Sequence, residues 1–83
     1  MKIILRVELA DGTTDEVVCG AKDFVAFEDK YQRSIARFEQ EMKLTDLLFL
    51  AWHSLYRQKK TTKDFDAWLD DVESIEPSEQ DPK

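Results

Sequence analysis

The side chains of this sequence that could do chemistry are few: one histidine, one cysteine and several closely spaced aspartates. His53 lies four residues before Arg57, and no cysteine or second histidine stands at metal-ligand spacing from it. A general base needs an oriented partner and an activated nucleophile close by, and the sequence indicates neither for His53. We therefore expect His53 at the surface or at the edge of the core, without a catalytic or metal-binding role.

Cys19 and the aspartates have equally plain interpretations. Cys19 closes a segment with the alternation of a β-strand, so we expect a buried, unreactive thiol, and a single cysteine indicates a reducing compartment. The pairs Asp64/Asp66 and Asp70/Asp71 stand on a short helical segment without a phosphate-binding loop, which favours a solvated face over acid–base or metal chemistry. The sequence therefore predicts no enzyme, no cofactor and no bound metal.

The charge of the chain is uneven along its length. The net charge is −6, yet residues 1–63 hold eleven basic and ten acidic side chains, whereas residues 64–83 hold eight acids and one lysine. Such a chain is not steered toward the phosphates of nucleic acids, so we expect no nucleic-acid partner. No segment reaches the roughly 18 apolar residues of a membrane span, and no basic start precedes an apolar run. We expect a cytosolic protein with no membrane partner.

The elements that must position these side chains begin with a β-hairpin. Residues 2–9 alternate between apolar and polar side chains, which is the pattern of a strand with one buried face. Asp11-Gly12 is a strong signal for a hairpin turn, and residues 13–19 supply the returning strand. A lone hairpin is barely stable in water, so helices must cover its apolar face.

Two loop lengths are compatible with this turn, and they present opposite faces of the second strand. A two-residue loop would place Glu16 on the buried face. A three-residue loop, with Gly12 in the left-handed conformation, pairs Leu5 with Val17 and sets Arg6 opposite Glu16 on the outer face. We predict the three-residue loop, because it buries no charge.

Three helical segments follow the hairpin. Residues 22–43 contain no glycine or proline, and apolar side chains recur there every three or four positions, which predicts one long helix. Thr45 is the expected N-cap of a medium-length second helix that ends in the cations around Arg57, and Thr62 that of a short third helix. The apolar stripe of the long helix consists of Phe24, Phe27, Tyr31, Ile35, Phe38 and Met42.

The fold class that follows is α+β. We predict a single domain over residues 1–72, in which the N-terminal hairpin packs on a three-helix unit of one long, one medium and one short helix. From residue 73 onward the chain has little to bury, so residues 73–83 are expected to form a disordered acidic tail. A chain of 83 residues is near the lower size at which one core suffices without disulfides or metals.

The second helix has more apolar surface than one face of a small domain hides. The side chains that we expect to serve the domain's own core are Leu48, Trp52, Leu55, Phe65 and Trp68. On a helical wheel Leu47 and Leu50 leave that face, and Tyr56 is their neighbour. We therefore predict that Leu47, Leu50 and Tyr56 bind a partner, and that the chain self-associates as a homo-oligomer.

Three short segments within residues 24–70 resemble a known family. They are Phe27-Glu28-Asp29-Lys30-Tyr31, Leu50-Ala51-Trp52-His53 and Asp64-Phe65-Asp66-Ala67-Trp68-Leu69. They are similar to packing motifs of the small tail assembly chaperones of long-tailed phages, especially phages that infect actinobacteria. The resemblance implies a non-enzymatic protein of the host bacterial cytoplasm, absent from the mature virion. Such a chaperone binds the helical tape measure protein and keeps it soluble until the tail tube polymerises around it.

Two other functions stay open on the residues alone. A small acidic phage inhibitor that mimics DNA and blocks a host defence nuclease would use the acids of residues 64–83, and its binding would be sensitive to salt. Those acids are concentrated at one end of the chain rather than spread over the fold, which favours the chaperone. A structural subunit of the virion is the third alternative, and it would persist in purified particles.

Overall fold

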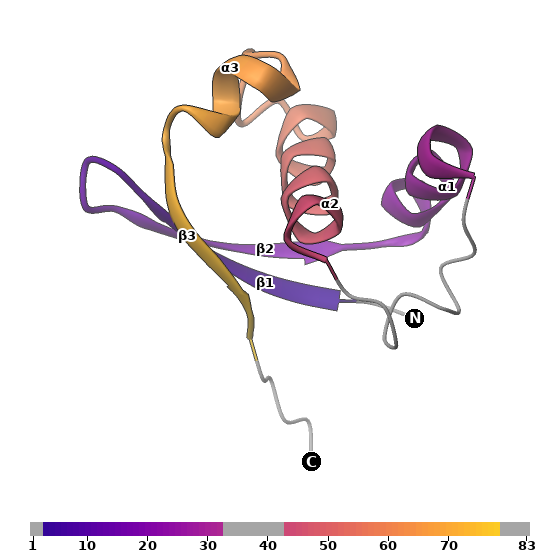
Figure 1. Ribbon diagram of the computed structural model, residues 1–83, viewed down its shortest axis with the longest axis horizontal. Helices are drawn as coiled ribbons and strands as arrows, with labels where there is room; N and C mark the ends of the chain where they lie inside the picture. The colour runs from indigo at the N-terminus through magenta and orange to yellow at the C-terminus, as the bar shows by residue number, and fades with distance from the viewer. Residues whose placement is uncertain (1–2, 33–42, 79–83) are drawn as a thin grey trace.

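In the computed structural model, residues 3–32 and 43–78 are described, and they form a three-stranded antiparallel sheet with helices on one face (Figure 1). The strands are β1 (Ile3–Leu9), β2 (Thr14–Cys19) and β3 (Val72–Pro77), in the order β2-β1-β3. The helices of these residues are α1 (Ala21–Tyr31), α2 (Leu44–Arg57) and α3 (Phe65–Leu69). The predicted α+β class, an N-terminal hairpin packed with helices, is therefore confirmed.

The hairpin has the predicted register. Leu5 lies opposite Val17, and Arg6 lies opposite Glu16. Because side chains alternate along a strand, this register places Leu5 and Val17 on the face toward the helices and the charged pair on the other face. The prediction of a three-residue loop, which rested on keeping Glu16 out of the core, is confirmed.

The loop of the hairpin owes its shape to one glycine and one aspartate. The N–H of Leu9 donates to the Thr13 carbonyl over 2.8 Å, and the N–H of Gly12 donates to the Leu9 carbonyl over 2.9 Å. Gly12 has a φ of 95°, in the region that residues with a Cβ avoid. The Asp11 carboxylate accepts from both the N–H and the hydroxyl of Thr13, over 2.9 and 2.7 Å.

β3 is the element that the sequence does not predict. The expectation of a disordered tail from residue 73 is wrong for residues 73–77, which pair with β1 as part of β3. Ile75 lies opposite Val7 and so adds an apolar side chain to the covered face. Pro77 is tolerated because β3 is an edge strand and the Pro77 nitrogen points away from β1, since the N–H of the next residue, Ser78, donates to the Ile4 carbonyl. Residues 79–83 of the predicted tail lie outside the described residues.

The long helix predicted for residues 22–43 ends early. α1 stops at Tyr31, and Gln32 follows it as C-cap in the left-handed conformation, with a φ of 54°. The N–H of Gln32 donates to the Glu28 carbonyl over 2.8 Å and so closes the last turn. The rest of the predicted stripe, which comprises Ile35, Phe38 and Met42, lies outside the described residues.

Both predicted N-caps are misplaced. α2 begins at Leu44 with Lys43 as its N-cap, rather than with Thr45. α3 is capped by Asp64 instead of Thr62, because the Asp64 carboxylate accepts from the Ala67 N–H over 2.8 Å. A carboxylate at this position also complements the positive end of the helix dipole.

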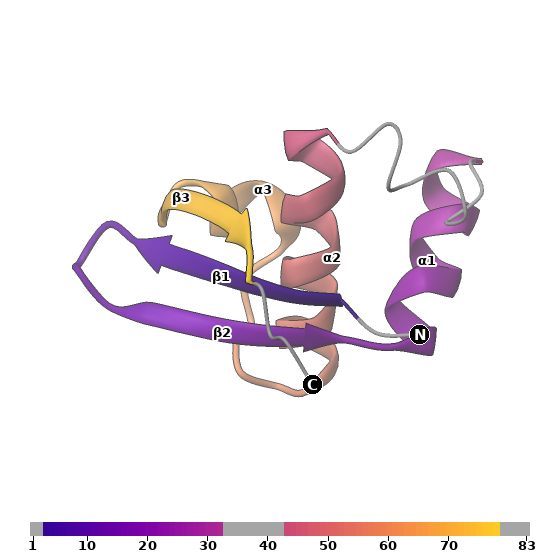
Figure 2. The same cartoon turned by 90° about the horizontal axis from the view of Figure 1, so that it is seen from below.

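The core is one layer between the sheet and the helices. Figures 1 and 2 show all three labelled helices on the same side of the sheet, and Figure 2 views the molecule from the uncovered side. The buried apolar side chains are Leu5, Val7, Val17, Cys19, Phe24, Phe27, Leu47, Phe49, Leu50, Ala51, Leu55 and Trp68. They come from two strands and all three helices, so α2 is packed from several sides at once.

Candidate functional site

The structure places the three residues predicted to bind a partner in two different environments. Leu47 and Leu50 are 7% and 0% exposed, so the prediction that they form a surplus apolar face is wrong. The reason is that α2 is enclosed, because the sheet covers one side of it while α1 and α3 pack against others (Figure 1). Tyr56, in the last turn of α2, is 48% exposed and remains a candidate.

Tyr56 forms one wall of an open hollow at the C-terminal end of α2. The hollow, named the Tyr56 hollow below, has a volume of about 290 Å³ and is lined by Tyr56, Lys59, Thr61 and Thr62. The Tyr56 ring stacks on Trp52, with 5.0 Å between centroids and 28° between planes. Trp52 is itself fixed, because its indole N–H donates to the Lys63 carbonyl over 2.9 Å. The ring of Tyr56 is therefore supported by that of Trp52, which is in turn hydrogen-bonded to the backbone at Lys63.

The turn that ends α2 supplies the basic part of this surface. The N–H of Lys60 donates to the Leu55 carbonyl over 2.8 Å, and the N–H of Lys59 donates to the Tyr56 carbonyl over 3.0 Å. The backbone of Lys59 is in the left-handed conformation, with a φ of 63°. A residue in this conformation after a helix commonly allows the last helical carbonyls to be hydrogen-bonded. Both lysines are exposed, and neither forms an ion pair with another described residue.

Aromatic rings continue inward from Trp52. Phe49 lies 5.9 Å from Trp52 and 5.5 Å from Tyr31 of α1, between ring centroids. Phe65 of α3 lies 5.6 Å from Trp52. Rings at these separations, tilted or edge to face, attract one another beyond their buried area. The cluster connects three helices and thereby holds Tyr56 in a fixed position relative to the core.

A second candidate site, which the sequence did not predict, is a buried carboxylate between α1 and α2. Asp23 has no exposed surface. Arg57 binds it with two hydrogen bonds, from Nε to Oδ1 over 3.2 Å and from Nη2 to Oδ2 over 2.9 Å. Nδ1 of His53 lies 2.6 Å from Oδ1, and the N–H of Gly20 donates to Oδ2 over 2.9 Å. One carboxylate therefore caps α1 and ties it to α2.

The charge state of this Asp23 cluster follows from its contacts. Burial by itself raises the pKa of Asp23, but the hydrogen bonds from Arg57, His53 and Gly20 outweigh it and hold the pKa below the ordinary 3.8. An ionised carboxylate only accepts, so Nδ1 of His53 carries a hydrogen and donates a hydrogen bond to Asp23. The His53 ring also packs 5.7 Å from Phe49, which gives it a place in the helix interface. His53 was predicted at the surface or at the edge of the core, and with 25% of its side chain exposed it lies at the edge.

Cys19 lies where the hairpin register predicts it, fully buried on the covered face. Its thiol donates to the Leu50 carbonyl over 3.5 Å. Burial first, and then the negative charge of Asp23, raise the pKa of Cys19 to about 12. Because the thiolate is the nucleophile, a thiol that stays protonated at neutral pH is a poor one.

Two of the aspartates in and around the third helix have structural contacts. Asp64 caps α3, and Asp71 forms an ion pair with Lys63. No three His, Cys, Asp or Glu side chains gather around a point that would hold a metal ion in residues 3–32 and 43–78. The helices of the described part of the chain are also too short or too polar to cross a membrane.

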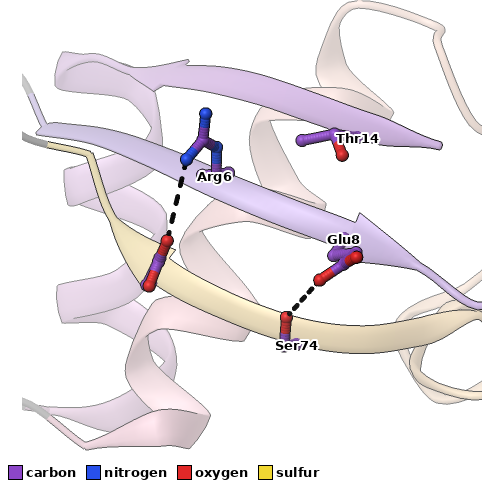
Figure 3. Close-up of a pocket in the computed structure, with 5 residues that line it drawn as sticks. Arg6, Glu8, Thr14 and Ser74 are labelled. Atoms are coloured by element: carbon purple, nitrogen blue, oxygen red, sulfur yellow. Dashed lines mark hydrogen bonds and ion pairs between the residues drawn. The ribbon is translucent and has the colours of Figure 1, made fainter. Parts of the chain in front are cut away.

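The uncovered face of the sheet carries charged side chains in rows across the strands (Figure 3). Arg6 lies between Glu16 and Glu76, and its guanidinium is 3.9 Å from the Glu76 carboxylate. In the next row Glu8 accepts from the Ser74 hydroxyl over 3.2 Å. A shallow hollow of about 270 Å³ lies here, lined by Arg6, Glu8, Thr14, Ser74 and Glu76. With three glutamates around one arginine, this is the acidic sheet face of the molecule.

Comparison with known proteins connects the chain to no family. No protein-family model, no curated protein and no solved structure matches it. Two features of the described residues offer a surface to another molecule, namely the Tyr56 hollow and the acidic sheet face.

Proposed function

We propose that the chain is a non-enzymatic tail assembly chaperone of a long-tailed phage, which binds the tape measure protein and keeps it soluble during tail assembly. The proposal rests on the resemblance of residues 24–70 to that family. The structural observation that supports it is the Tyr56 hollow, where a half-exposed tyrosine is stacked on Trp52 beside an open depression. The protein would act in the host cytoplasm and be absent from the mature virion.

The Tyr56 hollow suits a helical client for physical reasons. Tyrosine and tryptophan anchor interfaces, since each offers a large apolar ring at little cost in side-chain entropy. An amphipathic helix presents an apolar side chain every three or four residues, and one such side chain can enter a hollow of about 290 Å³. Lys59 and Lys60 beside the hollow favour a client with acidic residues next to its apolar stripe.

Co-expression tests this function. The client to co-express is a phage tape measure protein, and the readouts are the soluble fraction of the client and its co-purification. We expect the wild type to raise client solubility and Tyr56→Ala to lose most of that gain. Val25→Ala is the matched control, because Val25 is 66% exposed on α1 and outside the hollow. A client that stays insoluble and unbound beside the wild type would refute the function.

A nuclease inhibitor that mimics DNA is a second candidate, and the acidic sheet face is the observation that favours it. Glu8, Glu16 and Glu76 gather on one face rather than only at the C-terminal end of the sequence. Arg6 stands among them and interrupts the negative surface, which argues against a run of phosphate-like charges. Strong, salt-sensitive binding to a host nuclease that Glu8→Gln/Glu76→Gln abolishes would favour this candidate over the chaperone.

A further inference from the structure

The molecule has surfaces of opposite charge on opposite sides of the sheet. Among the described residues, the acidic sheet face carries three glutamates and one arginine, which leaves it negative. The connection from α2 to α3 lies on the helix side of the sheet (Figure 1). Residues 57–63 of this connection contain four basic side chains and no acid. The positive surface is therefore turned away from the negative one.

Two of these four basic side chains are already neutralised. Arg57 is bound to Asp23, and Lys63 is bound to Asp71. Lys59 and Lys60 remain, exposed and beside the half-exposed ring of Tyr56. We name Tyr56, Lys59 and Lys60 the basic end of the molecule.

We propose that copies of the chain associate head to tail, with the basic end of one copy seated on the acidic sheet face of the next. Lys59 and Lys60 lie against Glu8 and Glu76, whose carboxylates border the hollow of about 270 Å³ on that face. This contact pairs opposite charges across an interface, the arrangement that selects a partner and fixes its register.

The apolar part of the basic end also has a counterpart on the sheet. Val18 is 46% exposed and pairs with Ile4 in the row next to Arg6. Neighbouring rows on one face of a strand are about 7 Å apart, so this apolar row lies directly beside the charged row of Arg6 and Glu76. Tyr56 therefore packs on the row of Val18 and Ile4 while the lysines meet the glutamates.

A contact between two like surfaces is disfavoured by the same charges. Two acidic sheet faces would repel each other, and so would two basic ends. The association is therefore heterologous, and contacts of that kind generate rings or open chains rather than closed dimers. Exposed lysine–glutamate pairs are individually weak, so the association is reversible and depends on ionic strength.

The test is sedimentation equilibrium of the purified chain at low salt and at about 0.5 M NaCl, where charges are screened beyond a few ångströms. We expect the average mass to rise with concentration at low salt and to return to the monomer at high salt. Because the whole chain carries a net charge of −6, non-specific repulsion would give the opposite salt dependence. A monomer at all concentrations in low salt, or an association that grows with salt, overturns the proposal.

A charge swap identifies the surfaces. Lys59→Glu/Lys60→Glu makes both surfaces acidic, and Glu8→Lys/Glu76→Lys makes both basic, so each variant alone should be monomeric. An equimolar mixture should associate again, because every contact between the two variants pairs opposite charges. Lys22→Glu/Lys43→Glu is the matched control, since it reverses two exposed lysines elsewhere and should associate as the wild type does. Circular dichroism confirms that each variant is folded, and a mixture that stays monomeric refutes the assigned surfaces.

This inference is independent of the proposed client, since the measurement uses the isolated chain. If the client also occupies the Tyr56 hollow, it competes with the neighbouring copy for the same ring. Addition of client to the associated protein would then release monomers in one-to-one complexes. Loss of client binding with association intact would count against the chaperone alone, whereas loss of association with client binding intact would count against the head-to-tail contact alone.

Discussion

Asp23 and Arg57 form a bidentate ion pair across the interface of α1 and α2, although 34 residues separate them in the sequence. The carboxylate is fully buried, whereas one third of the arginine side chain is exposed. The same carboxylate caps the helix that it belongs to, through the N–H of Gly20. The Asp23 side chain therefore caps α1 and also fixes its position against α2.

Asp23→Asn should destabilise the protein by about 2–4 kcal/mol, because removing one partner of a buried pair leaves the other uncompensated. The cost stays below the upper limit for such pairs, since Arg57 can turn its exposed part to water. Urea unfolding followed by tryptophan fluorescence measures it. Asp29→Asn is the matched control on the same helix, where the side chain is exposed, and it should stay within about 0.5 kcal/mol of the wild type. Equal midpoints for the two variants would contradict the role assigned to Asp23.

Acid should weaken the fold through the same residue. The pKa of Asp23 is depressed in the folded state, so its contribution is complete above the unfolded value of about 3.9 and is lost as the pH falls through the folded pKa. Urea midpoints measured between about pH 6 and pH 2 should fall more steeply for the wild type than for Asp23→Asn, which lacks this titration. Parallel curves for the two proteins would show that Asp23 is not ionised in the fold.

Cys19 should be unreactive while the protein is folded. Its pKa of about 12 leaves almost no thiolate at pH 8, whereas a cysteine in an unfolded chain has a pKa of about 8.5. We expect a thiol reagent such as Ellman's reagent to react at least about 100-fold more slowly with the native protein than with the same protein in denaturant. Rapid labelling of the native chain would show that the end of β2 is open to solvent.

The two glycines of the chain should respond differently to the same substitution. A Cβ at Gly12 or at Gly20 would meet no atom within 4 Å, so neither substitution to alanine causes a steric clash. Gly12 has a φ of 95°, and Gly12→Ala should therefore cost about 1–2 kcal/mol of backbone strain. Gly20, the N-cap of α1, is extended at a φ of −122°, so Gly20→Ala should cost less, because only the preference for glycine over alanine at an N-cap opposes it. Equal unfolding midpoints for the two alanine variants would contradict the left-handed turn.

The parts of the fold that the sequence predicted are those set by neighbours along the chain. The hairpin register followed from the turn and from keeping Glu16 out of the core, and both are local constraints. β3 escaped prediction, because its sequence is short and acidic and contains Pro77, and because its partner is β1 at the far end of the sequence. The predicted exposure of Leu47 and Leu50 was wrong for a similar reason. α3 and α1 cover sides of α2 that a helical wheel of α2 alone shows as exposed.

The Asp23 cluster could have been suspected but not located. Asp23 lies four residues before Phe27 and eight before Tyr31, so it falls on the apolar stripe of its helix, which is an unusual place for a charge. His53 and Arg57 are also four residues apart and thus share one face of α2. The face of α2 that contacts Asp23 depends on how α1 and α2 pack together. The spacing of residues within each helix does not predict that packing. Tyr56 was predicted to bind a partner as the neighbour of Leu47 and Leu50, and it is the one of these three residues that is exposed.

The position of β3 has a consequence for how the chain folds in a cell. The central strand β1 is synthesised first, and one of its two neighbours is the last element of the sheet to emerge from the ribosome. Until then one edge of β1 has no native partner, and pairings between distant segments form more slowly than local ones. The hairpin of β1 and β2 can form before residues 72–77 emerge, but the sheet is completed only after they do. A chaperone that shields exposed strands would have that interval in which to act on this protein.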